Sequence, residues 1–97
     1  MNPLTPNERS ALDRLIGHAM RDSGQSRKVA DYLLAWWNAD TCGRFDFRDM
    51  WSCDDEIVAD MVTVFALIGR CNAYPDAVGY KEQFQALVRD WRPDLKD

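Results

Sequence analysis

The stretch from Ile57 to Cys71 constrains the fold more than any other part of the chain. It is apolar on most sides of a helical projection, and no turn signal interrupts it. It contains many β-branched residues, but it is longer than the usual strand, so it predicts a helix that starts at Ser52 or Asp54. A helix that is apolar nearly all round is normally buried. We therefore expect this helix at the centre of the fold.

Two helices are predicted before this stretch, because apolar residues recur at helical spacing on both sides of a Ser-Gly turn. Thr5 and Glu8 can form a capping box at the start of the first helix. Gly24 can take the left-handed conformation that ends a helix, so we expect it to close the first one. Ser26 is then expected to cap the second helix, which ends after Trp37.

The rest of the chain predicts a short turn and one more helix. Asp46 can cap a helical turn, with an extended strand over residues 44–47 as the alternative. Pro75 breaks the helical pattern, and the last helix then runs up to Pro93, which closes it. The chain is therefore predicted to be all-α, a compact bundle of four main helices plus a short helical turn, in a single domain of residues 1–97.

The chain start and the cysteines predict the compartment. Residues 1–7 lack the basic and apolar regions of a signal peptide. The longest mostly apolar stretch, residues 61–69, is about half of the roughly 20 residues that a membrane span needs. Cys42, Cys53 and Cys71 form no Cys-x-x-Cys motif, so they predict reduced thiols rather than a disulfide framework or a zinc site. We expect a cytoplasmic protein with no cofactor and no membrane partner.

The negative charge is concentrated in one part of the chain. The net charge is −4, and residues 40–60 alone carry −5, from seven acidic and two basic residues. Such a cluster can attract a basic partner or imitate nucleic-acid phosphates. However, Asp54, Asp55 and Glu56 also lie at a predicted helix N-terminus, where each carboxylate contributes about 0.3–1 kcal/mol through the helix dipole. Both interpretations stay open.

Catalytic motifs are not found. His18 is the only histidine and lies near the apolar stripe of the first helix, which is typical of a partly buried structural residue. The sequence contains no nucleophile motif, Gly-rich phosphate loop, metalloprotease motif or dinucleotide fingerprint. We therefore expect neither an enzyme nor a metal site.

The tryptophans are the more informative residues. Two or three of Trp36, Trp37, Trp51 and Trp91 are expected in the core. Neighbours on a helix point about 100° apart, so one of Trp36 and Trp37 is expected to reach the rim. Exposed tryptophan is typical of binding hot spots. The predicted partner-binding surface joins these aromatics to the acidic segment and comprises Trp36, Asp46, Asp49, Trp51, Asp54, Asp55, Glu56 and Asp60.

Direct DNA binding is a weaker hypothesis. Arg21, Arg27 and Lys28 surround the first turn, which allows a helix-turn-helix interpretation. The second helix is nevertheless too apolar to read a groove, and a compact DNA-binding domain usually carries a basic excess. The sequence therefore does not favour direct nucleic-acid binding.

Five strings of the sequence are distinctive when taken together. They are LAWWNA (34–39), DMVTVF (60–65), YPD (74–76), GY (79–80) and LVRDWRP (87–93). They resemble a family of small uncharacterised proteins carried on integrative conjugative elements and plasmids of proteobacteria. The resemblance covers roughly residues 30–95 and leaves out the first helix. It implies a bacterial, mobile-element setting, and it brings no catalytic residues.

The leading hypothesis is a non-enzymatic protein-binding module that acts through the acidic and aromatic surface. By analogy with other small acidic proteins of mobile elements, it would be an anti-defence, anti-CRISPR-like inhibitor of a host protein such as a nucleic-acid-binding defence complex. One alternative is a DNA-associated regulatory or maintenance protein of the element. Another is a self-associating structural protein, in which the aromatic face forms a homodimer interface.

Overall fold

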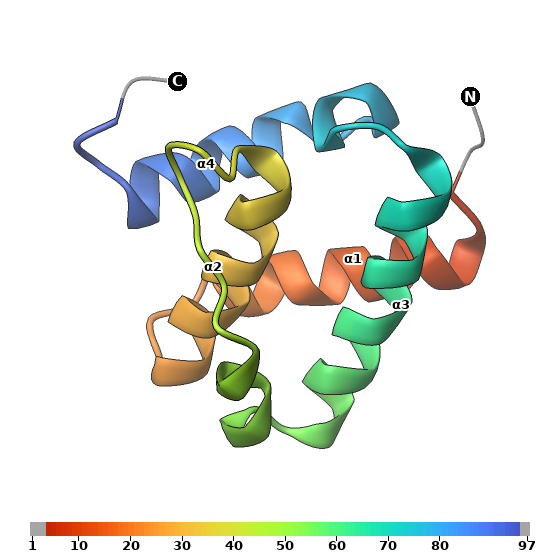
Figure 1. Cartoon of the computed structure of the whole chain (residues 1–97), viewed down its shortest axis with the longest axis horizontal. Coiled ribbons are helices and arrows are strands. Elements are labelled where there is room, and N and C mark those ends of the chain that lie inside the picture. Colours follow the sequence, from red (N-terminus) through yellow and green to blue (C-terminus); the bar gives the residue numbers. More distant parts are fainter. Residues whose placement is uncertain (1–3, 96–97) are drawn as a thin grey trace.

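The computed structural model describes residues 4–95 and shows an all-helical fold over that range (Figure 1). The elements are α1 (Pro6–Ala19), α2 (Gly24–Trp37), η1 (Phe47–Ser52), α3 (Asp55–Cys71), η2 (Pro75–Val78) and α4 (Lys81–Trp91), where η marks a 3₁₀ helix. The prediction of four main helices plus a short helical turn is confirmed, and η2 is one further turn. Residues 1–3 and 96–97 of the predicted domain lie outside the described range, so its boundaries stay a prediction.

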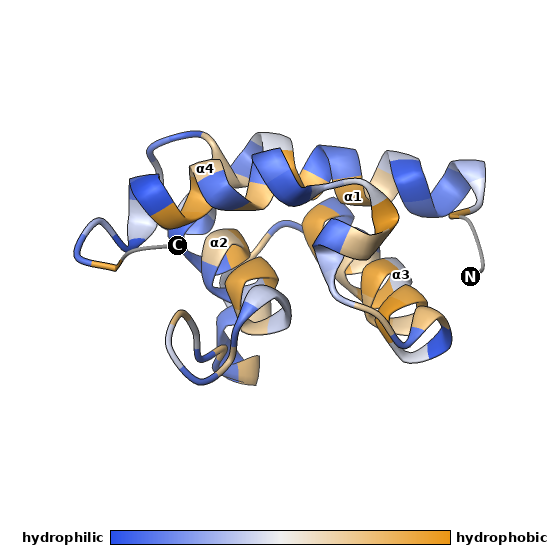
Figure 2. Ribbon diagram, turned by 90° about the horizontal axis from the view of Figure 1, so that it is seen from above, coloured by the Kyte–Doolittle hydropathy of each residue, from blue (hydrophilic) through white to orange (hydrophobic). Residues whose placement is uncertain are grey.

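Helix α1 is the element on which α2 and α3 are assembled. Its buried face consists of Ala11, Leu12, Leu15, Ile16 and Ala19, and both α2 and α3 pack against it. Figure 1 shows α2 and α3 running side by side in front of α1. The perpendicular view in Figure 2 places α1 and α4 on one side of the molecule and α2 and α3 on the other. The fold is thus two layers, with α1 holding the second layer together.

Helix α3 is not the buried central helix that its composition predicted. Ile57, Met61, Val64 and Leu67 are buried, but Val62 is 59% exposed. Within residues 4–95 only α1 packs closely along α3, and one neighbour covers only one face of a helix. The prediction was wrong because the helix has a second apolar face that no other element covers, as the mostly apolar colouring of α3 in Figure 2 illustrates.

The second helix begins earlier than predicted. Ser23, rather than Ser26, is its N-cap, and the Ser23 hydroxyl accepts a hydrogen bond from the Ser26 backbone N–H at 3.1 Å. Gly24 is therefore the first residue of α2 and does not end α1, which stops at Ala19. The Ser23 side chain thereby satisfies one of the free backbone donors in the first turn of α2.

Other local predictions are confirmed. Thr5 and Glu8 form the predicted capping box, and Asp46 caps η1, so residues 44–47 are not a strand. Pro75 breaks the helical pattern and opens η2, which ends at Gly79 with a φ of 95° that glycine adopts without strain. His18 is half-buried, as expected for a structural residue.

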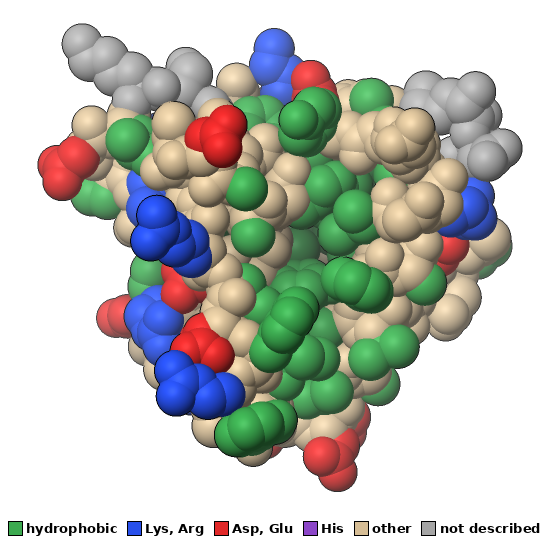
Figure 3. Space-filling view, viewed as in Figure 1, with side chains coloured by type: hydrophobic (Ala, Val, Ile, Leu, Met, Phe, Trp, Pro, Cys, Tyr) green, Lys and Arg blue, Asp and Glu red, His purple; other side chains and the backbone are tan. Residues whose placement is uncertain are grey.

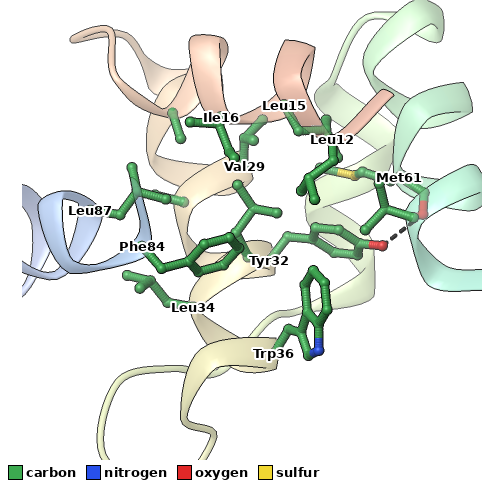
Figure 4. Close-up of a cluster of buried hydrophobic side chains, with 14 of the residues drawn as sticks. Leu12, Leu15, Ile16, Val29, Tyr32, Leu34, Trp36, Met61, Phe84 and Leu87 are labelled. Carbon is green, nitrogen blue, oxygen red and sulfur yellow. Dashed lines mark hydrogen bonds between the residues drawn. The ribbon is translucent and has the colours of Figure 1, made fainter. Parts of the chain in front are cut away.

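Aromatic residues of α2 and α4 pack together in the core, where Figure 4 shows Tyr32, Trp36 and Phe84. Phe84 packs edge-on against Trp36, with ring centroids 5.7 Å apart, and stacks with Trp37 at 5.8 Å. The Tyr32 hydroxyl donates a hydrogen bond to the Met61 carbonyl at 2.6 Å, and burial raises the pKa of Tyr32, which keeps this donor protonated. Tyr32 therefore joins the middle of α2 to α3.

Helix α4 is hydrogen-bonded to α1 at both of its ends. The Tyr80 hydroxyl donates to the Asp13 carboxylate at 2.8 Å, and the Trp91 indole N–H donates to the Ala19 carbonyl at 2.8 Å. Burial, together with the bond to Asp13, raises the pKa of Tyr80 to about 12. The phenol therefore stays a hydrogen-bond donor at neutral pH, and α4 is held along α1.

The connection after α2 approaches that helix closely at Gly43. A Cβ atom at this position would lie 2.8 Å from the backbone nitrogen of Ala35 and 2.9 Å from the carbonyl carbon of Leu34. Both are backbone atoms of α2 and cannot move aside cheaply. Only glycine therefore allows the acidic segment to leave α2 along this path.

We expect the substitution Gly43→Ala to lower the free energy of unfolding by about 1–3 kcal/mol, because the added methyl group forces the connection away from α2. The measurement is urea unfolding followed by far-UV circular dichroism. Gly17→Ala is the control, since a Cβ there meets nothing within 4 Å and replaces glycine inside a helix. It should raise the free energy of unfolding by roughly 0.5–1 kcal/mol. Equal effects of the two substitutions would contradict the close approach.

Candidate partner-binding surface

The acidic segment, residues 40–60, runs from the end of α2 through η1 into the start of α3 (Figure 1). Two aromatic side chains on η1 project into solvent. Trp51 is 83% exposed and Phe47 is 69% exposed. A tryptophan exposed to this extent does not contribute most of the free energy that burial of its large apolar surface would supply. Trp51, one of the predicted partner-binding residues, is therefore exposed within the acidic segment.

Local hydrogen bonds hold η1 in a defined conformation. The Asp46 carboxylate accepts from the Arg48 backbone N–H at 2.9 Å and from its guanidinium at 2.6 Å. These bonds from Arg48 lower the pKa of Asp46 to about 2, so its charge persists through the neutral range. At the other end of the turn, the Ser52 hydroxyl donates to the Asp49 carbonyl at 3.2 Å.

A chain of rings links the exposed surface to the core. Phe47 contacts Phe45 edge-on with centroids 6.0 Å apart, and Phe45 contacts Tyr32 in the same manner at 5.2 Å. Tyr32 is buried, Phe45 is half-buried and Phe47 is exposed. The aromatic surface of η1 therefore continues from the core.

The three acids at the start of α3 are exposed, as a contact surface requires. Asp55 and Glu56 lie in the first turn of α3. Asp54 occupies the N-cap position without a side-chain cap bond, and its backbone N–H donates to the Gln25 side chain at 2.7 Å. These positions agree with the helix-dipole interpretation, and they also leave three carboxylates facing solvent.

Two of the predicted site residues are instead buried. Asp60 accepts two hydrogen bonds from the Arg14 guanidinium, both at 2.9 Å, and so joins α3 to α1. Trp36 is only 8% exposed, and its indole N–H donates to the Ala73 carbonyl at 2.9 Å. Both residues lie on the inward-facing sides of their helices. The sequence pattern did not show which side of each helix faces inward. The more exposed member of the tryptophan pair is Trp37, which is half-buried.

Asp49 is half-buried and lies at the edge of an ionic network centred on Asp31. Asp31 is buried on α2 and pairs with Arg27 at 2.6 Å and with Arg92 at 2.7 Å, while Arg27 reaches Asp49 at 4.0 Å. Arg92 also donates to the Cys42 carbonyl at 2.6 Å. The network ties α2, α4, η1 and the connection before it together. The i,i+4 spacing of Arg27 and Asp31 was the available sequence signal for it, and our sequence analysis missed it.

The cations of the DNA-binding hypothesis are partly engaged in the fold. Arg27 belongs to the Asp31 network, and the Lys28 ammonium donates to the Ser52 hydroxyl. Arg21 is exposed in the turn between α1 and α2. Two of the three cations therefore serve contacts within the chain.

An apolar stripe that the sequence analysis assigned to the core lies on the outer face of α3. Val58, Val62 and Phe65 follow i, i+4, i+7 spacing and so share one side of the helix. Phe65 is 65% exposed and Val58 is half-buried. Figure 3 shows hydrophobic side chains gathered on the face that carries α2, η1 and α3, around the hollow between these elements. This face therefore carries exposed apolar side chains near the acidic residues at the start of α3.

The described residues offer few groups for other chemistry. Cys42, Cys53 and Cys71 are free thiols, as predicted, and burial raises the pKa of Cys53. Across residues 4–95, no three His, Cys, Asp or Glu side chains gather closely enough to hold a metal ion. In the same range no helix has both the length and the apolar character needed to cross a membrane.

Comparison with known families gives one match. Residues 9–92 match the model of a family described as "Family of unknown function (DUF7673)". The chain belongs to this family. No curated protein and no solved structure matches it. The expected membership of an uncharacterised family is confirmed, and the DUF7673 match extends back to residue 9 and includes most of α1, which the resemblance had left out.

We expect the ion pairs of Asp31 to stabilise the fold of this DUF7673 member. Asp31→Asn removes the charge shared by Arg27 and Arg92, and we expect the free energy of unfolding to fall by about 1.5–3 kcal/mol. Urea unfolding measures the change. Asp90→Asn is the control, because Asp90 is exposed on α4, and its effect should stay within about 0.5 kcal/mol. A similar value for both variants would show that the network contributes little.

Proposed function

We propose that this chain is a non-enzymatic protein-binding module that contacts its partner through η1 and the start of α3. The observation that carries the proposal is the exposure of Trp51 and Phe47 on a turn fixed by its own hydrogen bonds. A rigid turn loses little conformational freedom on binding, and tryptophan is enriched among the residues that dominate binding energy. The aromatic pair is therefore proposed as the anchor.

The charge around the anchor supports a partner with a basic surface. Asp46 stays ionised, and Asp54, Asp55 and Glu56 are exposed beside η1. Carboxylates placed around an aromatic anchor raise the association rate with a cationic surface and discriminate against acidic ones. Asp60 and Trp36 are not part of the proposed contact, since both are buried.

The biological setting forms part of the proposal. On the resemblance to proteins of proteobacterial mobile elements, the partner would be a host protein in the cytoplasm. The module would act as an anti-defence, anti-CRISPR-like inhibitor by occupying the nucleic-acid-binding surface of a defence complex. The acidic segment supports this idea because its carboxylates can take the positions of nucleic-acid phosphates. The DNA-associated alternative draws less support, since Arg27 and Lys28 are engaged within the chain.

Affinity capture from a lysate of the bacterium that carries this protein, followed by binding measurements with the purified partner, tests the proposal. We expect Trp51→Ala to raise the dissociation constant about 30-fold or more, the effect of losing a hot-spot residue of about 2 kcal/mol. Replacing Asp54, Asp55 and Glu56 by Asn, Asn and Gln should weaken binding mainly at low salt, because exposed charges are screened.

The matched control is Met20→Ala, which shortens an exposed apolar side chain in the turn between α1 and α2, outside the proposed contact, and should leave binding unchanged. Capture of the same partner by Trp51→Ala with undiminished affinity contradicts the proposal. Salt-dependent binding to duplex DNA without a captured protein would favour the regulatory alternative.

Self-association is a second candidate, favoured by the apolar stripe of α3. Val58, Val62 and Phe65 have the spacing of a helix–helix seam. This candidate predicts dimers in sedimentation equilibrium and monomers when Val62 and Phe65 are both replaced by Glu. The control is Thr63→Glu, a half-buried neighbour on another side of α3. A wild-type chain that is monomeric at high concentration rejects this candidate and leaves the proposed module intact.

A further inference from the structure

An open hollow lies at the end of α2 opposite to η1. It has a volume of about 680 Å³ and is bounded by the last turn of α2, the residues that follow it and the turn that leads into η2. Its aromatic and charged lining residues are Trp36, Trp37, Asp40, Tyr74 and Asp76. In Figure 1 these segments lie near one another at the top of the molecule, although they are far apart in the sequence.

The aromatic walls of this hollow are fixed from behind. Trp36 is anchored by its bond to the Ala73 carbonyl, directly before Tyr74. Trp37 stacks on the buried ring of Phe84 with an interplanar angle of 22°. Tyr74 is 65% exposed. The hollow therefore presents two indole rings held by the core and the exposed ring of Tyr74, and the faces of such rings attract cations.

The charge of the hollow is negative and uncompensated. Asp40 and Asp76 are exposed, and neither takes part in an ion pair within residues 4–95, unlike Asp31, Asp46 and Asp60. The lining includes no Lys or Arg. The turn that carries Asp40 is held by the Asn38 side chain, which accepts hydrogen bonds from the backbone N–H groups of Asp40 and Thr41 at 3.1 and 3.2 Å.

We propose that this hollow binds an arginine side chain of a partner polypeptide. The flat guanidinium stacks on an aromatic ring while its N–H groups reach the carboxylates of Asp40 and Asp76. Arginine fits better than lysine, because guanidinium is planar, is weakly hydrated and pairs with carboxylates through two parallel hydrogen bonds. The inference goes beyond the proposed function, since the hollow lies at the other end of α2 and shares no residue with the anchor on η1.

The test is a titration of ¹⁵N-labelled protein with the blocked tripeptide acetyl-Gly-Arg-Gly-amide, followed by NMR. We expect saturable shifts of the Trp37 indole N–H and of the backbone amides of Asp40 and Asp76, with a dissociation constant in the millimolar range. The citrulline peptide has nearly the same shape without the charge and should bind at least about ten-fold more weakly. The lysine peptide should bind several-fold more weakly than the arginine peptide.

Variants of the chain complete the test. The double variant Asp40→Asn with Asp76→Asn should weaken binding of the arginine peptide at least about ten-fold, and Tyr74→Ala should weaken it about three-fold or more. Asp22→Asn with Asp90→Asn changes the net charge equally at exposed sites elsewhere and should leave binding unchanged. Amide dispersion in the same spectra shows that each variant is folded.

Three results would overturn the inference: absence of saturable shifts, equal binding of the citrulline or lysine peptide, or an equal loss in the two double variants. None of these results depends on Trp51. The arginine site and the partner surface on η1 can therefore fail or hold separately.

Discussion

The packing of α2 and α3 against the same helix, α1, is the interaction on which the rest of the structure depends. The buried face of α1 includes Leu12, Leu15 and Ile16. Helices α2 and α3 both bury their apolar sides against α1, and they run side by side in front of it. Two ion pairs, Arg14 with Asp60 and Glu8 with Arg70, join α1 to α3 at its surface. Apolar burial on one shared helix supplies the main attraction, and the polar contacts fix how the helices sit on it.

The packing of α3, closely on α1 alone within residues 4–95, explains where this chain exposes apolar surface. A helix packed on one neighbour buries one face, so the second apolar face of α3 stays open and displays Phe65. At one end of α2, η1 presents Trp51 beside the acids that open α3. At the other end, Trp37 and Tyr74 border a hollow with two unpaired carboxylates. Exposed aromatic and apolar groups of this kind are typical of interaction surfaces.

The acidic residues divide into two groups with different physical roles. Asp31 and Asp60 are buried and bonded to arginines, so they hold elements of the fold together. Asp54, Asp55 and Glu56 are exposed and do not pair with a cation within residues 4–95. Exposed carboxylates of the second kind can attract a partner at low energetic cost, whereas a buried, paired carboxylate would first have to lose its own arginine.

The sequence by itself determined the helical class, the capping box of α1, the Asp46 cap of η1 and the break at Pro75, since each depends on residues close together in the chain. Tertiary structure decided which faces are covered. It buried Trp36 and Asp60, exposed Phe65 and Val62, and brought Asp31 between two arginines. Helical spacing defines how side chains are arranged around one helix, but their burial depends on how many neighbours that helix has. The tertiary structure gives α3 one close neighbour within residues 4–95, helix α1, and so leaves its second apolar face exposed.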